Sequence, residues 1–245
     1  MHAPTRLIVA NWKTYLSHTE SIVLLEEHKQ VLNEATQKNT QLVICPTFTA
    51  LPAMHSLLQA TMIKLGAQDC SAFDEGSHTG DVAAQSLAEI QCHYCIIGHN
   101  ERRAYYHESN DIIVKKAQQL FTHNIAPIIC IGEDRQTQTF KHIAETLAEQ
   151  LVPIVELYES YLHIPLCVAY EPAWAIGTGV TPQPTIIAAV GEFVRKLTPH
   201  HVTFLYGGSV NERDFKSLEQ IKEINGFLIG KASTDMTSLL AILKN

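Results

Sequence analysis

The sequence predicts an α/β fold of the (β/α)8 barrel type, in which eight parallel strands are surrounded by helices. Two features predict it: eight short apolar runs recur along the chain, and amphipathic stretches lie between them. The length agrees, because 245 residues are close to the roughly 250 of one such barrel. An open doubly wound sheet usually has fewer strands and an early glycine fingerprint, and neither GxGxxG nor GxxxxGK(S/T) follows any run here.

The apolar runs are the expected strands. Each is continuously apolar and does not alternate with polar residues, which is typical of a strand buried on both faces in a parallel sheet. In chain order the runs are 7–11 (LIVAN), 41–45 (QLVIC), 63–67 (IKLGA), 94–98 (YCIIG), 126–132 (APIICIG), 166–170 (LCVAY), 203–208 (TFLYGG) and 226–230 (GFLIG).

The stretches between these runs are the expected crossover helices. Apolar residues recur there at three- and four-residue spacing, most clearly at 22–32, 111–121, 143–158 and 186–197. No linker, low-complexity tract or break in composition divides the chain. We therefore expect residues 1–245 to form a single barrel domain.

Composition and charge limit the possible partners. Hydrophobic residues make up 46% of the chain and charged residues 18%, which suits a globular protein with a sizeable core. The formal net charge of -7 gives no general attraction to nucleic acid or to an anionic membrane. An anionic ligand must therefore be held by local donors.

The N-terminal residues do not resemble a signal peptide, and no apolar run approaches the roughly 20 residues of a membrane span. We expect a cytoplasmic protein. Six cysteines are present, and four of them lie within or beside apolar runs, where a reduced thiol acts as a small hydrophobic group. Cys92 and Cys95 form a CxxC motif, which raises a metal or redox role, but no second pair at zinc spacing accompanies it. We expect neither a metal site nor a cofactor.

Polar residues at the predicted strand ends are the candidate site, because ligands of such barrels bind at the C-terminal ends of the strands. Asn11 and Lys13 end the first run, His99 follows the fourth and Glu171 follows the sixth. Each alone has an ordinary structural explanation, such as a solvated cation, a structural histidine or a loop cap. Their joint placement on one rim favours a site.

Three of these side chains suit acid–base chemistry. A carboxylate at the rim of an apolar strand loses hydration and accepts a proton more readily, and Pro172 restricts the backbone of Glu171. His99 lies where a helix N-terminus would disfavour a positive imidazolium, so a neutral ring that donates a hydrogen bond is expected. Lys13 supplies positive charge for an enediolate or a phosphate.

Glycine-rich segments complete the candidate site. The segment from Pro172 to Pro182 (PAWAIGTGVTP) is either a surface loop or a lid whose apolar residues exclude water. The turns after the seventh and eighth runs contain Ser209, Gly230 and Lys231 beside further glycines. In these barrels the corresponding loops commonly bind phosphate through backbone N–H groups.

With these residues the sequence resembles the triosephosphate isomerase family along the whole chain. The motifs AYEPAWAIGTG (169–179), IIGHNERR (96–103), CIGE (130–133) and YGGSV (206–210) occur in the family's order and spacing. The resemblance implies a TIM barrel and an isomerase that interconverts glyceraldehyde 3-phosphate and dihydroxyacetone phosphate in glycolysis and gluconeogenesis. It also implies a homodimer in which the loop at 68–82 reaches into the partner's site.

The resemblance assigns the roles of individual residues. It implies Glu171 as the base, His99 as the neutral electrophile, and Lys13 and Asn11 as substrate-binding groups; this division of roles is the family's own and is carried over. The further implied residues are Gly177, Ser209, Gly230 and Lys231 for the phosphate, Glu101 for positioning Lys13, and Tyr206 for holding a closed lid.

The sequence departs from the family at several positions. Asn100 stands where the family usually has Ser, Asp81 where it has Glu, Lys231 where it has Gly, and Pro182 lies at an unusual lid exit. No catalytic group is lost. Two other functions are alternatives: another phosphate-binding barrel enzyme, such as a lyase or synthase, and a catalytically silent barrel kept for binding.

Overall fold

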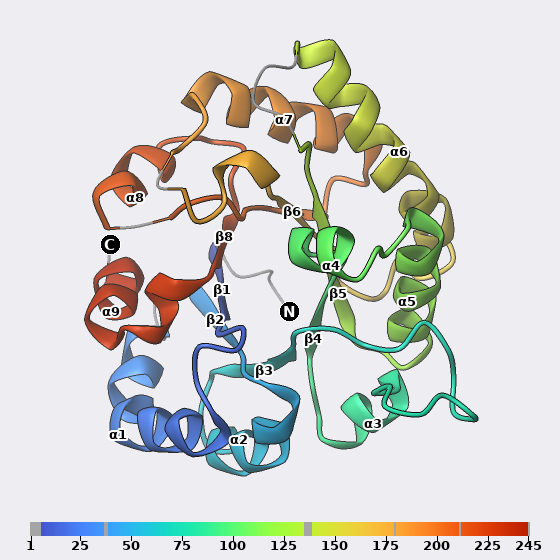
Figure 1. Cartoon of the computed structure of the whole chain (residues 1–245). Coiled ribbons are helices and arrows are strands. Elements are labelled where there is room, and N and C mark those ends of the chain that lie inside the picture. Colours follow the sequence, from blue (N-terminus) through green and yellow to red (C-terminus); the bar gives the residue numbers. More distant parts are fainter. Residues whose placement is uncertain (1–5, 37–38, 135–138, 179, 211, 245) are drawn as a thin grey trace.

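The computed structural model describes residues 6–36, 39–134, 139–178, 180–210 and 212–244. Its strands form a closed barrel in the order β1 to β8, and every neighbouring pair is parallel. The predicted barrel is confirmed (Figure 1). The strands are β1 (Arg6–Asn11), β2 (Thr40–Cys45), β3 (Lys64–Ala67), β4 (Tyr94–Ile97), β5 (Ala126–Ile131), β6 (Cys167–Tyr170), β7 (Thr203–Tyr206) and β8 (Gly226–Ile229).

The strands are buried on both faces, as their continuous apolar runs predicted. Along β1, Leu7 and Val9 belong to a core cluster built from strand residues alone, which fills the barrel interior. The alternate residues Ile8 and Ala10 belong to the larger cluster that also contains the helices. β1 therefore contributes side chains both to the barrel interior and to the core between strands and helices.

Helices surround the strands (Figure 1). The four expected helices lie where the sequence predicted them, although each begins one to four residues earlier. A polar residue, Ser109 or Thr139, caps two of them. Ser109 Oγ, for example, accepts a hydrogen bond from the Ile112 amide at 3.3 Å. The helices are α1 (His18–Thr36), α2 (Leu51–Leu58), α3 (Ala84–Glu89), α4 (Asn100–Tyr105), α5 (Asn110–Thr122), α6 (Phe140–Tyr158), α7 (Pro184–Leu197), α8 (Glu212–Leu218) and α9 (Met236–Lys244), with short 3-10 turns η1 (Phe48–Ala50), η2 (Ala173–Ala175) and η3 (Lys231–Thr234).

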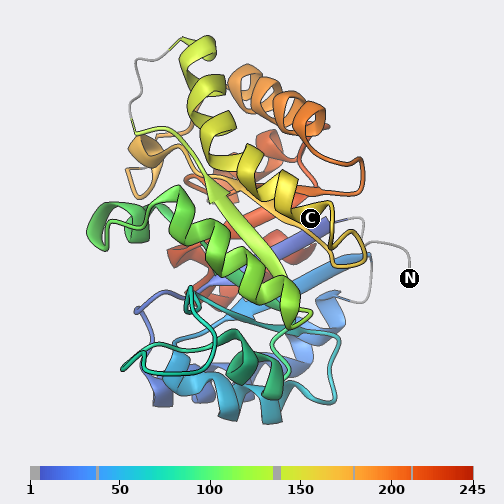
Figure 2. The same ribbon diagram turned by 90° about the vertical axis from the view of Figure 1, so that its right-hand side faces the viewer.

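Helix α6 shows how the outer layer packs. It buries Ile143, Leu147, Leu151, Ile154 and Tyr158, which recur every three or four residues and so share one face. Figure 2 shows α5 and α6 lying across the outside of the strands. Within the described residues, none of the helices is both long and apolar enough to cross a membrane.

Candidate active site

The residues predicted at the strand ends meet at one end of the barrel. Asn11 is the last residue of β1, His99 lies just beyond β4, and Glu171 directly follows β6. A cavity of about 130 Å³ lies between these residues and the turns after β7 and β8. The predicted residues that line it are Asn11, Lys13, His99, Glu171, Gly177, Ser209, Gly230 and Lys231.

The Glu171 carboxylate is buried and held at both oxygens. Its side chain is 2% exposed, and Oε1 lies 3.2 Å from His99 Nε2. The other oxygen, Oε2, accepts a hydrogen bond from the backbone amide of Asn100 at 3.1 Å. Asn100 therefore orients the carboxylate through its main chain, a contact that does not depend on which side chain stands there.

The hydrogen bonds of His99 define its tautomer. His99 is the N-cap of α4, and its Nδ1 accepts a hydrogen bond from the Glu101 amide at 3.2 Å. A backbone amide can only donate, so Nδ1 carries no proton and Nε2 carries the single proton of a neutral ring. Nε2 faces Glu171 Oε1 and is directed at the base. The role of His99 as the neutral electrophile stays a prediction.

Lys13 is held in an unusual backbone conformation. Its φ is 46°, a left-handed value that side-chain-bearing residues seldom adopt. The Lys13 amide donates to Asn11 Oδ1 at 3.1 Å, and the Lys13 carbonyl accepts from Gln68 Nε2 at 2.9 Å. The ammonium pairs with Glu101 Oε1 at 2.6 Å. Backbone strain at a cavity, compensated by three polar contacts, is typical of a functional residue.

A buried carboxylate that sequence reasoning did not assign anchors the start of the predicted lid. Glu133 is 1% exposed, and its Oε1 accepts hydrogen bonds from Trp174 Nε1 at 2.9 Å and from the Tyr170 hydroxyl at 3.0 Å. Burial raises the pKa of Glu133, although both hydrogen bonds oppose the shift. The available signal was the position of Glu133 in CIGE, directly past β5.

The middle of the lid segment lies at the cavity. Gly177 lines it with a φ of +71°, a conformation in which a side chain would be strained. Thr178 Oγ1 donates to the Ala175 carbonyl at 3.0 Å and stabilises the turn. Gly179, the second glycine of the predicted lid, lies outside the described residues.

The glycines after β7 are required by close packing. A Cβ on Gly207 would lie 2.9 Å from Glu171 Cγ, and one on Gly208 would overlap the Tyr206 hydroxyl. Tyr206 itself does not line the cavity. Its hydroxyl is buried and has no hydrogen-bond partner among the described residues. The predicted role of Tyr206 in holding a closed lid stays a prediction.

Glu171 also lines a second, larger cavity of about 480 Å³, together with Asn100 and Cys130. Burial, and then the charge of Glu171, raise the pKa of the Cys130 thiol. Cys130 therefore stays a neutral thiol beside the carboxylate. Sequence reasoning treated it only as a buried apolar residue.

The two cysteines of the CxxC motif are buried, neutral thiols. Cys92 and Cys95 are free and buried, and burial raises the pKa of Cys92 to about 12. Such thiols are poor nucleophiles and poor ligands. The parts of the chain that the structure describes contain no group of three or more His, Cys, Asp or Glu residues placed to hold a metal ion.

The closed parallel barrel, with a carboxylate, a neutral imidazole and a lysine around a cavity at the strand ends, defines the class as a (β/α)8 barrel protein with its site at the C-terminal face. The family model described as triosephosphate isomerase matches residues 6–245. The chain belongs to the triosephosphate isomerase family.

Proteins of the same name are similar along the whole length. The triosephosphate isomerase of Thermus thermophilus is 35% identical over 246 residues, which cover 97% of each chain. That of Dictyoglomus turgidum is 35% identical over 248 residues, covering 98% of this chain and 99% of the relative. That of Aquifex aeolicus is 36% identical over 249 residues, covering 97% and 98%.

Proposed function

We propose that the protein interconverts glyceraldehyde 3-phosphate and dihydroxyacetone phosphate through an enediolate, as a step of glycolysis and gluconeogenesis. The observation that carries this proposal is the geometry around one cavity: the Glu171 carboxylate lies 3.2 Å from the neutral His99 Nε2, and Lys13 lines the same cavity. Another phosphate-binding activity is not favoured, because the relatives carry the isomerase name.

The reaction needs only proton transfer. Glu171 removes a proton from one carbon of the substrate and returns it to the neighbouring carbon. The Nε2–H of His99 donates to the substrate oxygens as negative charge develops, and the Lys13 ammonium stabilises that charge. Asn11 fixes the Lys13 backbone and contributes to substrate binding.

The phosphate is held by backbone groups of Gly177, Ser209, Gly230 and Lys231, all of which line the cavity. Since the chain is net negative, these local donors and Lys13 supply the attraction. Three residues support the site: Glu101 orients Lys13, the Asn100 amide orients Glu171, and Tyr206 holds the lid at 172–182 when it closes over the substrate.

The active form is a homodimer. Arg102 and Asp81 line a cavity of about 380 Å³, and exposed aromatic side chains surround it: Phe48, Phe73 and Tyr106 are 37%, 47% and 66% exposed. Exposed aromatic groups around a charged pocket are typical of a protein interface. The second copy supplies its loop at 68–82 to this face.

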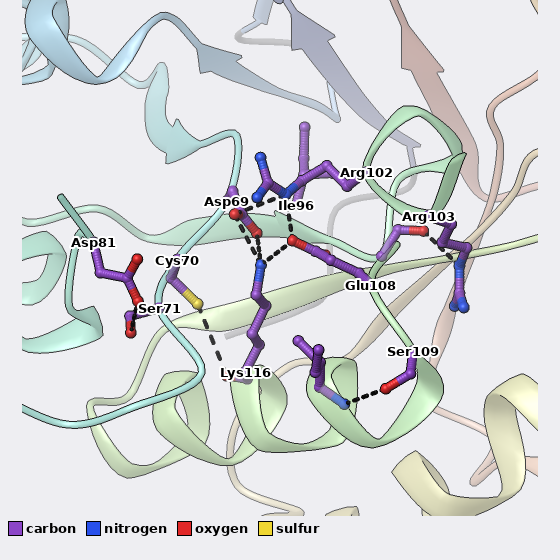
Figure 3. A network of polar contacts seen from close by, with 12 residues as sticks. Asp69, Cys70, Ser71, Asp81, Ile96, Arg102, Arg103, Glu108, Ser109 and Lys116 are labelled. Carbon is purple, nitrogen blue, oxygen red and sulfur yellow. Dashed lines mark hydrogen bonds and ion pairs between the residues drawn. The ribbon is translucent and has the colours of Figure 1, made fainter. Parts of the chain in front are cut away.

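Behind this face lies the buried network in Figure 3. The Lys116 ammonium donates to Asp69 Oδ1 at 2.6 Å and also pairs with Glu108, while Arg102 Nε lies 2.8 Å from Asp69 and 2.6 Å from Glu108. The network holds the Arg102 guanidinium in one position, so this face is preorganised to bind the second copy.

We also propose that residues 1–245 work as one catalytic domain in the cytoplasm. All six cysteines are free and buried, which suits a reducing compartment.

A coupled assay of both reaction directions tests the activity. The wild-type protein should interconvert the two triose phosphates, and Glu171→Gln should lower kcat by at least about 10²-fold while the circular dichroism spectrum is unchanged. A folded wild-type protein without turnover would support the silent-barrel alternative. Full turnover in Glu171→Gln would show that another group is the base.

A further inference from the structure

A second concave site lies at the opposite end of the barrel. Two cavities, of about 370 Å³ and 170 Å³, share Lys64, Gln91 and His93 as lining residues. Lys64 is the first residue of β3, and His93 directly precedes β4. The site is thus at the N-terminal ends of the strands, away from Glu171 by the length of the barrel.

The site gathers basic groups without counter-charges. Lys64 Nζ lies 3.4 Å from His93 Nε2, and His55 lines the smaller cavity beside them. No Asp or Glu is among the described residues that line either cavity. Within the described part of the chain, none of these three groups makes an ion pair.

Backbone hydrogen bonds fix the position of His93 in the sheet. The His93 amide donates to the Leu65 carbonyl at 2.9 Å, and the His93 carbonyl accepts from the Ala126 amide at 2.9 Å. His93 is therefore fixed between β3 and β5. The last turn of α2 would oppose an anion, but Thr61 satisfies the Leu58 carbonyl with both its amide and its hydroxyl, at 2.9 and 2.8 Å.

The charges of the groups that face the site favour an anion. The pKa of His93 is lowered by burial, then by the charge of Lys64 and, after an opposing hydrogen bond to Gln91, by His55. The other titratable groups that face the site are Cys92 and Tyr94, and burial raises the pKa of both, so they stay neutral. A bound anion would relieve the repulsion between Lys64 and His93 and favour the imidazolium.

We propose that this groove is a second anion site that binds a phosphate group through Lys64, His93 and His55. The oxygens of a phosphate group can accept hydrogen bonds from the Lys64 ammonium and from ring N–H groups of His93 and His55, and either cavity accommodates one phosphate. An imidazolium at His93 binds an anion more strongly than the neutral ring does, so phosphate binding is linked to proton uptake at His93. The proposal does not depend on the chemistry at Glu171.

Histidine-ring NMR of the full-length protein tests it, because each ring reports its own site. Inorganic phosphate is titrated at pH 6.5 against sodium chloride of equal ionic strength, with glycerol 3-phosphate as a second probe. We expect saturable shifts at His93 and His55 and a raised pKa of His93 with phosphate. Tighter binding of glycerol 3-phosphate would identify a phosphomonoester as the ligand; equal binding would identify the free ion.

Variants complete the test. Lys64→Gln and, separately, His55→Gln should weaken phosphate binding at His93 about threefold to tenfold, with unchanged kcat. Lys196→Gln, at an exposed helix lysine, is the matched control and should leave the shifts unaltered. Shifts confined to His99, or shifts at His93 that chloride reproduces or that persist in Lys64→Gln, would overturn the proposal.

Discussion

At the scale of single residues, the main chain does much of the positioning. The base is held by the amide of Asn100, and the tautomer of His99 is set by the amide of Glu101. Side chains at positions 100 and 101 can therefore change with limited effect on these two contacts. The glycines are less replaceable, because Glu171 packs directly against Gly207.

Gly207→Ala should displace the base. The added Cβ would lie 2.9 Å from Glu171 Cγ, closer than such contacts occur, and both oxygens of Glu171 are already bound. We expect kcat to fall roughly tenfold to a hundredfold, as for a misplaced catalytic group, with a smaller change in KM. Steady-state kinetics measure this. An unchanged kcat would mean that the carboxylate accommodates the methyl group.

Several residues named from the sequence line the cavity, but Glu133 behind it was not among them. Asn11, Lys13, His99 and Glu171 were recognisable because polar groups at the ends of apolar strands are unusual. Glu133 was missed because its role depends on Trp174, which lies far along the chain. Such long-range pairings are not encoded in local spacing.

At the scale of elements, the lid segment is a short 3-10 turn between two anchors. Trp174 ties its start to Glu133, and the Thr181 hydroxyl lies 3.4 Å from Asp214 near its end. Each of these side-chain hydrogen bonds contributes about 0.5 to 1.5 kcal/mol, and the Ala173 amide also donates to the Glu133 carbonyl at 2.9 Å. Opening and closing should therefore respond to single substitutions.

Trp174→Phe should loosen the lid without unfolding the barrel. The ring is kept, but the hydrogen bond to Glu133 is lost, while Tyr170 still donates to the same oxygen. We expect faster amide exchange or proteolysis within 172–178 in the free enzyme. A two-carbon phosphate carboxylate should slow it again by closing the lid. Exchange equal to that of wild type would show that the bond does not restrain the lid.

The strands were predictable almost to the residue, whereas the helix ends were less so. Buried runs such as Ala126–Ile131 carry their own signal, because both faces are apolar. The helix starts depend on caps such as Thr139, a polar residue outside the apolar pattern. The short α3 and α8 have too few turns for a clear period.

At the scale of the whole molecule, buried charge makes stability depend on pH. Burial raises the pKa of Asp69 from 3.8 to about 6, although Lys116 and Arg102 oppose the shift. Between these two values the folded state binds more protons at Asp69 than the unfolded state. The free energy of unfolding contributed by Asp69 is therefore highest in acid and falls as the pH rises through about 6.

Asp69→Asn removes this dependence. The stability of wild type relative to the variant should decrease by about 1 kcal/mol from pH 5 to pH 7.5, as measured by urea unfolding at one protein concentration. Asp111→Asn, at an exposed aspartate, is the control and should show no such trend. A pH-independent difference for Asp69→Asn would mean that its folded pKa is ordinary.

Asp81→Glu tests the proposed dimer. Asp81 accepts a hydrogen bond from the Ser71 hydroxyl at 2.7 Å within its own chain, and it is one methylene shorter than the Glu usual in the family. A Glu should reach a second copy and tighten the dimer by about 0.2 to 1 kcal/mol, visible in sedimentation on dilution. Asp74→Glu, on the same loop, is the matched control. Unchanged or weaker association for Asp81→Glu would contradict the prediction.

The pairing of β1 with β8 has a consequence for how the protein is made. Ala10 of β1 lies beside Ile229 of β8 in the sheet, so the barrel can close only after β8 has been synthesised. A ribosome-bound chain that ends before Gly226 already carries Glu171 and His99, yet both edges of its sheet are open. Open edges pair with other chains. A chain truncated before Gly226 should therefore aggregate and should not act as a weaker enzyme.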